Sequence, residues 1–430
     1  MARKMKDSGI EWIGEIPEGW SKNKCLRLFN VIGSGTTPKS LVSDESPSIN
    51  WIQSGDINGT LLFSCKNTIS ESTFSQYSAL KTYSAPFIII AMYGASIGNI
   101  SISFIDGCVN QACCVLSVPL CNLDYAFYAI KSAQFYLVQK AVGGGQPNIS
   151  QDTIKQLWIP QPSLAVQEAI ANSLNKACSH IDAILTKTRT SIEEYKKLKQ
   201  AVITQAVTKG VRGEREMKDS GVEWIGEIPK EWVIQKIKSI SSRINVGVVI
   251  RPSEYFDENG TVPFLRGINV KEYLISSNNM VYINESSNHI LSKSQVHTDD
   301  ILIVRDGSIG TSCVVPAEYD GANVVSMVIV TPSISCDSRF TCYSLNSDVG
   351  KTQFTLTKIG SALTHTSVSA VSDIIVAVPS CTEQKEIAAY LDAKCAEIDG
   401  LIAKKEQLVK ELESYKKSLI YEVVTGKREV

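Results

Sequence analysis

The chain has 430 residues, which leaves room for roughly two to four domains of about 100–200 residues each. Hydrophobic residues make up 43% of the chain and charged residues 20%, a composition that argues for a folded core and against global disorder. The formal net charge of −1 removes any simple electrostatic argument for a nucleic-acid partner, without excluding one.

Membrane insertion and metal binding find little support in the sequence. No apolar run approaches the roughly 20 residues that a membrane span needs, and the first residues lack the apolar stretch of a secretory signal. We therefore expect a cytoplasmic protein with no membrane partner. The 12 cysteines include no Cys-x-x-Cys pair and the 4 histidines are scattered, so we expect buried, reduced thiols rather than a metal site.

One phrase occurs twice. MKDSGIEWIGEIPEGW at Met5–Trp20 returns as MKDSGVEWIGEIPKEW at Met217–Trp232, with identical residues at all but three positions. Such a repeat indicates that the chain is built from two related halves. We expect each copy to lead into one half, with its Trp and Ile side chains packed where a globular region meets a helix.

The regions that follow the two phrases, 20–160 and 233–378, alternate β-rich runs such as PFIIIAMYG and NVVSMVIV with loops rich in Gly, Ser, Asn and Pro. Short helical stretches interrupt them, Leu123–Val142 being one. This alternation predicts an α+β fold for each region.

Loops in the two regions echo each other unevenly. YGASIGN at Tyr93–Asn99 corresponds to RDGSIGT at Arg305–Thr311, and the small residues of both predict a tight turn or bulge. In contrast, GSGTTPKS at Gly33–Ser40 faces a very different INVGVVIRPS at Ile244–Ser253. The two halves have therefore diverged in their loops.

The end of each half predicts a long helix, over about 162–209 and about 380–425. Apolar side chains recur there in alternating steps of four and three, which is the pattern of a coiled-coil seam. Ser380 and Glu383 fit a capping box at the start of the second helix, and a glycine follows the last turn of each. The predicted seam comprises Ile170, Leu174, Ile181, Ile184, Tyr195, Leu198, Val202, Ile387, Leu391, Ile398, Leu401, Leu408, Leu412, Tyr415 and Leu419.

A single amphipathic helix on the surface of each globular domain is the alternative, but helices of about 40 residues are long for that role. We therefore expect an α+β fold with two pseudo-repeated domains separated by two long antiparallel coiled-coil helices, a dumbbell with pseudo-two-fold symmetry. The predicted parts are a first domain with its lead-in at 1–160, a helical spacer at 161–212, a second domain at 213–378 and a second helical spacer at 379–430.

Motifs that would indicate an enzyme are missing from the sequence. It contains no P-loop, no H-E-x-x-H, no G-x-S-x-G and no Asn/Asp-Pro-Pro-aromatic tetrapeptide of the kind that amino-methyltransferases use. Glu383-Gln384-Lys385 with Asp373 upstream has the form of a nuclease metal site, but its place at a helix start favours a helix-terminal role. We expect no catalytic site, metal or cofactor on this chain.

Two similar domains with diverged loops, held apart by a rigid spacer, suit a ligand with two unlike sites at a fixed distance. Double-stranded DNA is such a ligand, since dimeric readers face half-sites about one helical turn apart. The alternative is a protein–protein scaffold that joins two partners through the coiled coil without nucleic acid.

The order of these parts, the repeated phrase, SGTTP, YGASIGN and the ITQAVTKG helix end together resemble the specificity subunits of type I restriction-modification systems, over essentially the whole chain. The resemblance implies two target-recognition domains, each reading one half of an asymmetric bipartite target in double-stranded DNA. It implies helices that set the spacing and dock two methyltransferase subunits, with motor-nuclease subunits joining the restriction complex. It also implies a non-catalytic chain, with S-adenosylmethionine bound by the methyltransferase partner instead.

Loop residues with Arg, Lys, Asn or Gln side chains are the usual readers of base edges. The resemblance makes candidates in the first domain of Thr36, Thr37, Lys39, Gln53, Tyr93, Ser96, Gln146 and Asn148. In the second domain the candidates are Arg251, Arg266, Arg305, Ser308, His365 and Thr366. A hydrogen bond that only stabilises the loop is the alternative role for each of them.

Overall fold

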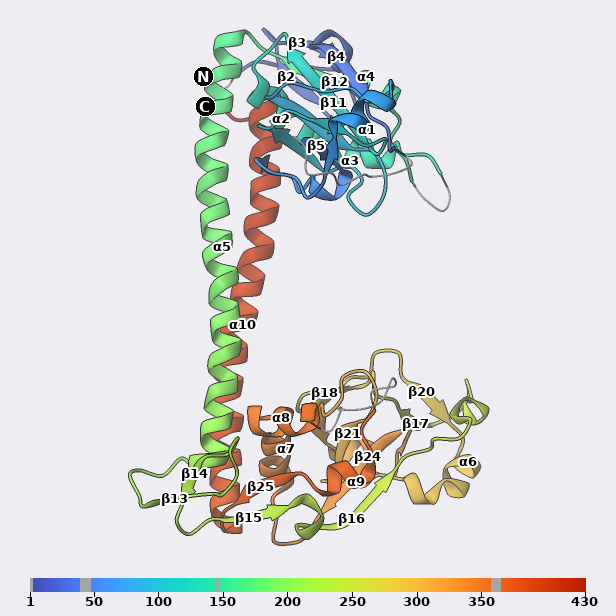
Figure 1. Ribbon diagram of the computed structural model, residues 1–430, viewed down its shortest axis with the longest axis vertical. Coiled ribbons are helices and arrows are strands. Elements are labelled where there is room, and N and C mark those ends of the chain that lie inside the picture. The colour runs from blue at the N-terminus through green and yellow to red at the C-terminus, as the bar shows by residue number, and fades with distance from the viewer. Residues whose placement is uncertain (1–2, 39–47, 144–146, 357–364) are drawn as a thin grey trace. The chain divides into compact units, whose positions relative to one another are not determined.

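The computed structural model describes residues 3–38, 48–143, 147–356 and 365–430. The chain divides into two compact units (Figure 1): unit 1 is Met1–Thr188 with Gln407–Val430, and unit 2 is Arg189–Glu406. Each unit holds one α+β domain and parts of the two long helices, α5 (Leu164–Lys209) and α10 (Cys381–Val424). Among the described residues, no helix has the length and apolar character that crossing a membrane requires.

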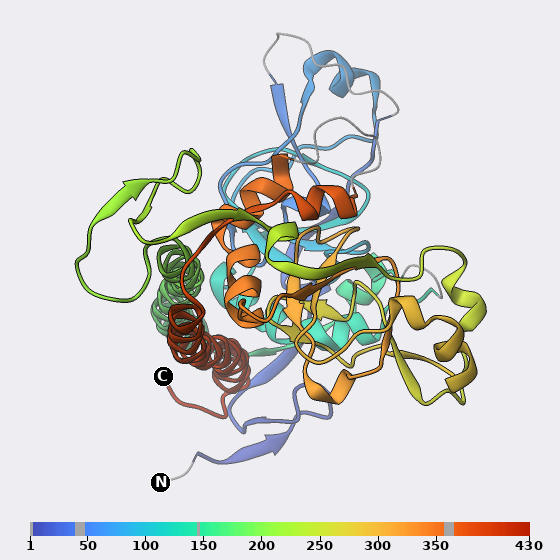
Figure 2. The ribbon, with the colours of Figure 1, turned by 90° about the horizontal axis from the view of Figure 1, so that it is seen from below.

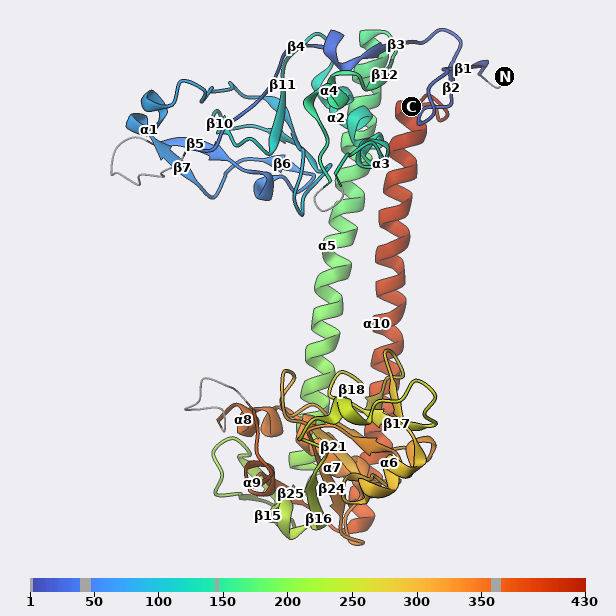
Figure 3. The same cartoon turned by 90° about the vertical axis from the view of Figure 1, so that its right-hand side faces the viewer.

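Domain 1, the α+β part of unit 1, is built on a five-stranded sheet of order β4-β11-β8-β9-β6 and a three-stranded sheet of order β10-β5-β7. The smaller sheet lies on the side of the domain away from α5 (Figure 3). The elements of unit 1 are β1 (Met5–Asp7), β2 (Glu15–Pro17), β3 (Ser21–Lys24), β4 (Phe29–Ser34), β5 (Ser48–Ile52), β6 (Leu61–Leu62), β7 (Thr68–Ser70), α1 (Glu71–Gln76), β8 (Phe87–Ala91), β9 (Ile100–Ser103), β10 (Cys108–Val109), β11 (Cys113–Pro119), α2 (Leu123–Ser132), α3 (Gln134–Gln139), α4 (Gln151–Lys155) and β12 (Trp158–Gln161).

Strand β8 lies at the centre of domain 1, and every one of its residues, Phe87–Ala91, is buried. Alternate side chains of a strand point to opposite faces. Ile88 and Ile90 therefore join the core that contains α2 and α5, whereas Ile89 packs with Ile52 and Val109 of the smaller sheet. The run of consecutive apolar residues is explained by burial on both faces.

Domain 2, the α+β part of unit 2, repeats this plan. Its larger sheet has the order β16-β24-β21-β22 and its smaller sheet the order β20-β17-β23. Helix α7 contacts α10 through Arg339 and Tyr343, which both bond to Asp392, and α8 contacts α5 through Lys351, which bonds to Gln200. Helix α6 lies at the far end of the domain (Figures 1 and 2). The elements of unit 2 are β13 (Met217–Asp219), β14 (Glu227–Pro229), β15 (Val233–Lys236), β16 (Ser241–Val246), β17 (Val262–Leu265), β18 (Val270–Lys271), β19 (Leu274–Ile275), β20 (Val281–Ile283), α6 (Glu285–Ile290), β21 (Ile301–Val304), β22 (Ser312–Val314), β23 (Asn323–Val324), β24 (Met327–Pro332), α7 (Ser338–Asn346), α8 (Asp348–Leu356), α9 (Val368–Ser372) and β25 (Ile375–Val378).

The repeated phrase has the same role in both units. In unit 1, Ile16 and Trp20 are buried in one core with Val423 near the end of α10. In unit 2, Trp232 is buried with Val207 near the end of α5. The Trp and Ile side chains of the phrase thus pack where a long helix ends and a domain begins, as the sequence predicted.

The two long helices pack against each other in each unit. Helix α5 begins in unit 1 and ends in unit 2, whereas α10 begins in unit 2 and ends in unit 1, so the two helices run antiparallel. An ion pair joins the helices in each unit. Lys416 Nζ lies 2.6 Å from Asp182 in unit 1, and Lys199 Nζ lies 2.6 Å from Asp399 in unit 2.

Four residues of the predicted seam are exposed, and four more are only half-buried. Leu198, Leu401, Leu408 and Tyr415 are exposed, and Ile184, Tyr195, Val202 and Leu412 are half-buried. The remaining predicted members are buried, namely Ile170, Leu174, Ile181, Ile387, Leu391, Ile398 and Leu419.

A shift of one residue explains this difference. After Ile181 the next buried residue is Leu185 rather than Ile184, and after Ile398 the half-buried Ile402 replaces Leu401. Both registers place apolar residues in the seam, so the hydrophobic pattern alone does not separate them. Lysines also occupy seam positions: Lys416 pairs with Asp182, and the ammonium of Lys405 lies 5.6 Å from the centre of the Tyr195 ring.

The start of α10 is capped differently from the prediction. Ser380 Oγ accepts a hydrogen bond from the Glu383 backbone N–H at 3.3 Å, as a capping box requires. The Glu383 carboxylate, however, points to Arg215 and Trp232, so the return half of the box is replaced by longer-range contacts. At the other ends, Gly210 and Gly426 have φ of +77° and +74° and close the helices, as predicted.

Candidate nucleic-acid interface

In domain 2, a hollow of about 410 Å³ opens between the loops that follow β17, β21 and β23. It contains two of the predicted contact residues with guanidinium groups, Arg266 after β17 and Arg305 after β21, and the predicted Ser308. Lys271, Asp306 and Ser326 complete its polar lining. The hollow therefore brings together basic and acidic side chains that are far apart in the sequence.

Backbone contacts fix the position of Arg305. Its Nε donates a hydrogen bond to the Thr366 carbonyl oxygen at 2.9 Å, and the Thr366 backbone N–H donates to the Arg305 carbonyl at 3.1 Å. Asp306 forms an antiparallel bridge with His365, which is exposed. The structure thus brings the predicted residues Arg305, His365 and Thr366 together, with Thr366 itself buried.

Arg266 is held by a folded loop. Its backbone N–H donates to Asn269 Oδ1 at 3.0 Å, and Asn269 Nδ2 in turn donates to the carbonyls of Ser276 and Asn278. The Arg266 Nη2 donates to the Asn279 carbonyl oxygen, and within the described part of the chain its buried Nε has no hydrogen-bond acceptor.

Two other predicted residues of domain 2 lie in different settings. Ser308 is exposed in a turn between Gly307 and Gly310, which have φ of +78° and +86°, so the turn predicted from RDGSIGT is confirmed. Arg251 does not line the hollow. It has φ of +46°, and its side chain forms an exposed ion pair with Glu254 at 3.2 Å.

In domain 1, Gln53 forms hydrogen bonds within its own loop. Its Oε1 accepts a hydrogen bond from Asn67 Nδ2 at 3.0 Å, and its backbone N–H donates to Asp56 Oδ2 at 2.9 Å in the short 3-10 turn Ser54–Asp56. Thr36 and Ser96 are half-buried and Thr37 is exposed. Lys39 and Gln146 lie outside the described residues.

Tyr93 and Asn148 are brought together, since they form an antiparallel bridge. The Ile149 backbone N–H also donates to the Met92 carbonyl at 2.8 Å. This arrangement matches the one in domain 2, where Asp306 bridges His365 and the Thr366 N–H donates to the Arg305 carbonyl.

Strand register corrects the loop equivalence suggested by sequence. Ala91 of β8 pairs with Cys113 of β11, and Val304 of β21 pairs with Met327 of β24. Ala91 and Val304 therefore occupy equivalent positions in the two larger sheets. Met92 therefore occupies the place of Arg305, and Tyr93 that of Asp306. Ala95 is the extra residue in the first turn, and it had shifted the sequence alignment by one.

Register also aligns the two loops that looked unrelated. Ser34 pairs with Cys114 in domain 1, and Val246 pairs with Val328 in domain 2, so Gly35 and Gly247 are equivalent. A Cβ atom at Gly35 would overlap the carbonyl oxygen of Val109, and one at Gly247 would overlap that of Val324. Close approach of the backbone to the smaller sheet requires glycine at both sites.

The hollow of domain 2 contains residues that sequence reasoning missed. Asp306 directly follows Arg305, so its place could have been found from the motif RDGSIGT. Ser326 has φ of +48° and donates a 3.4 Å hydrogen bond to Asp306 Oδ2, which no sequence signal indicates.

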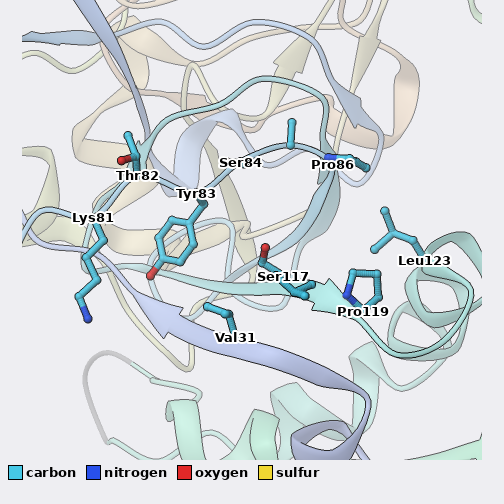
Figure 4. A pocket seen from close by; sticks show the side chains of 11 residues that line it. Val31, Lys81, Thr82, Tyr83, Ser84, Pro86, Ser117, Pro119 and Leu123 are labelled. Carbon is cyan, nitrogen blue, oxygen red and sulfur yellow. The ribbon is translucent and has the colours of Figure 1, made fainter.

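A second, larger hollow of about 620 Å³ lies in domain 1, lined by the segment Lys81–Pro86 and by parts of β4 and β11 (Figure 4). Burial raises the pKa of Tyr83, whose hydroxyl donates to the Ser34 carbonyl at 3.2 Å. No carboxylate or histidine is among the described residues that line this hollow, so it offers no acid–base pair. None of the predicted contact residues lines it.

The described residues also bear on metal and thiol chemistry. Within them, no group of His, Cys, Asp or Glu is arranged to hold a metal ion, and Asp373 instead pairs with Lys236 and Lys238. The cysteines are free thiols, most of them buried. Burial raises the pKa of Cys108 to about 11 and that of Cys313 to about 12, so both stay protonated at neutral pH.

The model of the family "Type I restriction modification DNA specificity domain" matches the chain twice, over residues 17–194 and 229–411. The chain belongs to this family. The two matches correspond to the two α+β domains with their helices, so the predicted family and the predicted fold class of two pseudo-repeated α+β domains with long antiparallel helices are both confirmed.

Individual relatives of the specificity family agree. The MjaVIII specificity subunit of Methanocaldococcus jannaschii is 26% identical over 70% of this chain and 69% of its own length. The MjaIX specificity subunit of the same organism is 22% identical over 85% of this chain and 84% of its own length. A solved structure described as the structural basis of complex assembly and conformational transition of the type I R-M system has a TM-score of 0.74 at 14% identity, covering 95% of this chain and 98% of that one, and shows the same fold.

Proposed function

We propose that this chain is the DNA-specificity subunit of a type I restriction-modification complex, in which each α+β domain reads one half of an asymmetric bipartite target in double-stranded DNA. The observation that carries the proposal is that the two domains share the order of their sheet strands but differ in the loops that follow those strands. Register places Met92 where domain 2 has Arg305, and Gln53 where domain 2 has Arg266, on sheets of the same strand order. Equivalent scaffolds that carry different side chains at the same positions would recognise different bases.

The helices α5 and α10 set the spacing of the two half-sites and dock two methyltransferase subunits. Apolar side chains on the exposed surface of α10 support this assignment: Tyr390 and Leu401 in unit 2, and Leu408 and Tyr415 in unit 1, are 36–48% exposed. Exposed apolar side chains that recur along a helix are suited to contact with another protein. Motor-nuclease subunits would join this assembly in restriction.

Catalysis belongs to the partners. The methyltransferase subunits would bind S-adenosylmethionine and modify adenine, and this chain would contribute recognition alone. Its near-zero net charge fits a division of labour in which the partners neutralise much of the DNA phosphate charge.

A methylation map tests the proposal. The methyltransferase subunit of the same system is expressed with or without this chain in a host that lacks adenine methylation, and modified adenines are mapped. We expect one split, asymmetric motif only when this chain is present. Unmodified DNA despite a stable protein complex would contradict the proposal.

A further inference from the structure

Two guanidinium groups share the hollow of domain 2 without a carboxylate partner. Within the described residues neither Arg266 nor Arg305 forms an ion pair. Each is held instead by a neutral main-chain carbonyl, that of Thr366 for Arg305 Nε at 2.9 Å and that of Asn279 for Arg266 Nη2. Among the described residues, no carboxylate lies within ion-pair distance of either guanidinium, and no hydrogen bond engages the two Nη atoms of Arg305, which can therefore bind a ligand.

Asp306 distinguishes between two classes of ligand. Its carboxylate lies in the same hollow, next to Arg305 in the chain, and accepts the long hydrogen bond from Ser326 Oγ. A phosphate group would be repelled by this carboxylate. A G·C base pair presents two acceptors, guanine O6 and N7, beside the cytosine N4 amino donor. Donors on Arg305 and an acceptor on Asp306 match that major-groove edge.

We infer that domain 2 reads a G·C base pair, with the Arg305 guanidinium bound to guanine and the Asp306 carboxylate to the cytosine amino group. The inference rests on the proposed DNA-reading function and names the base pair that one domain recognises. The backbone contacts with Thr366 fix the arginine before DNA binds, so little side-chain entropy is lost on binding.

Domain 1 cannot read this base pair in the same way. Buried Met92 takes the place of Arg305, Tyr93 that of Asp306, and Gln53, at the place of Arg266, accepts a hydrogen bond from Asn67. The half-site of domain 1 should therefore lack the arginine-dependent guanine at the equivalent position.

The test uses the complete complex with its methyltransferase subunits, acting on host genomic DNA. Arg305→Ala should lower the preference for guanine at one position of one half-site by roughly 5- to 150-fold, the range expected for one bidentate arginine–guanine contact. The other half-site should stay unchanged. Lys238→Gln, an exposed charge change elsewhere in domain 2, should leave the whole motif unchanged.

Arg305→Lys is the second variant, because it keeps the charge and the side-chain stem and should fold even if the alanine variant does not. It should also relax the guanine preference, since an ammonium lacks the planar pair of donors. Equal loss of methylation at every site with an unchanged motif would show a phosphate contact and overturn the inference. So would a domain 2 half-site without a G·C pair. Absence of any motif with the unaltered chain would instead contradict the proposed function.

Discussion

Glu383 Oε1 lies 2.7 Å from Arg215 Nη1, so the buried start of α10 is joined to the segment that leads into domain 2. The other carboxylate oxygen accepts a hydrogen bond from Trp232 Nε1 at 3.2 Å, and the Arg215 guanidinium lies over the Trp232 ring. In unit 1 the corresponding residue is Val166, so the two halves stabilise the same junction differently. Glu383 therefore stabilises unit 2 through its contacts with Arg215 and Trp232.

Removing this carboxylate should destabilise unit 2 strongly. Glu383→Ala leaves Arg215 largely buried without its partner, which typically costs about 3–5 kcal/mol. Arg212→Ala is the control, because the Arg212 side chain is 49% exposed, so the loss of its pairing with Glu386 and of its longer 3.9 Å contact with Glu383 should have a much smaller effect. Urea unfolding of the full chain measures both. Equal effects would contradict the importance of the buried pair.

The interhelical pair Asp182–Lys416 reports the helix register in unit 1. Lys416→Glu should destabilise the protein by roughly 0.2–1 kcal/mol, because it places two negative charges together on a partly exposed surface. Adding Asp182→Lys should restore the stability. A double-mutant cycle measures the coupling, and independent, additive effects would show that these residues do not meet.

Glycine should be indispensable at the equivalent positions Gly35 and Gly247. An alanine methyl group would overlap a backbone carbonyl in either domain, so each change should cost at least about 1–3 kcal/mol. Gly55→Ala is the matched control, since no atom lies within 4 Å of a Cβ there. Thermal unfolding of the three variants tests this, and a stable Gly247→Ala protein would contradict the alignment of the two loops.

Lys131 should make a pH-dependent contribution to the free energy of unfolding between neutral and alkaline pH. Burial, and secondarily the positive charge of Lys416, lowers the pKa of Lys131 to about 8, against about 10.4 in an unfolded chain. Between these values Lys131 holds more protons in the unfolded chain, so its own contribution to the free energy of unfolding should rise with pH, by about 1–3 kcal/mol. The difference in stability between the unaltered protein and the Lys131→Met variant should grow by this amount, whereas the difference for Lys66→Met, at an exposed lysine, should stay constant. Urea unfolding across pH 7–10.5 provides the measurement.

Repetition made much of the fold predictable. The phrase that ends in Trp20 and Trp232 marked both junctions, and the stepped apolar pattern marked both long helices. Leu408 and Tyr415 were wrongly assigned to the seam. A helix with apolar residues in two adjacent registers does not show from its sequence which of the two sets the partner helix covers. Lys416 was missed in the seam because its pairing with Asp182 depends on the other helix.

The site was less predictable than the scaffold. Arg266 and Arg305 were chosen by residue type, and the fold brings them to one hollow. The equivalence of Arg305 with Met92 required strand register, since one inserted residue, Ala95, hides it in the sequence. The equivalence of Gly35 and Gly247 was also hidden in the sequence. Contact with a backbone carbonyl requires glycine at that one position, whereas the neighbouring residues are free to differ between the two domains.

In the proposed complex, each domain reads its own half of the DNA target. The most direct test replaces residues 20–160 with the corresponding segment of another specificity subunit of known target and maps methylated adenines in cells that also express the methyltransferase subunit. We expect one half of the split motif to change to that of the donor, while the half read by domain 2 is retained. A motif that stays wholly unchanged, or in which both halves change, would contradict the proposal.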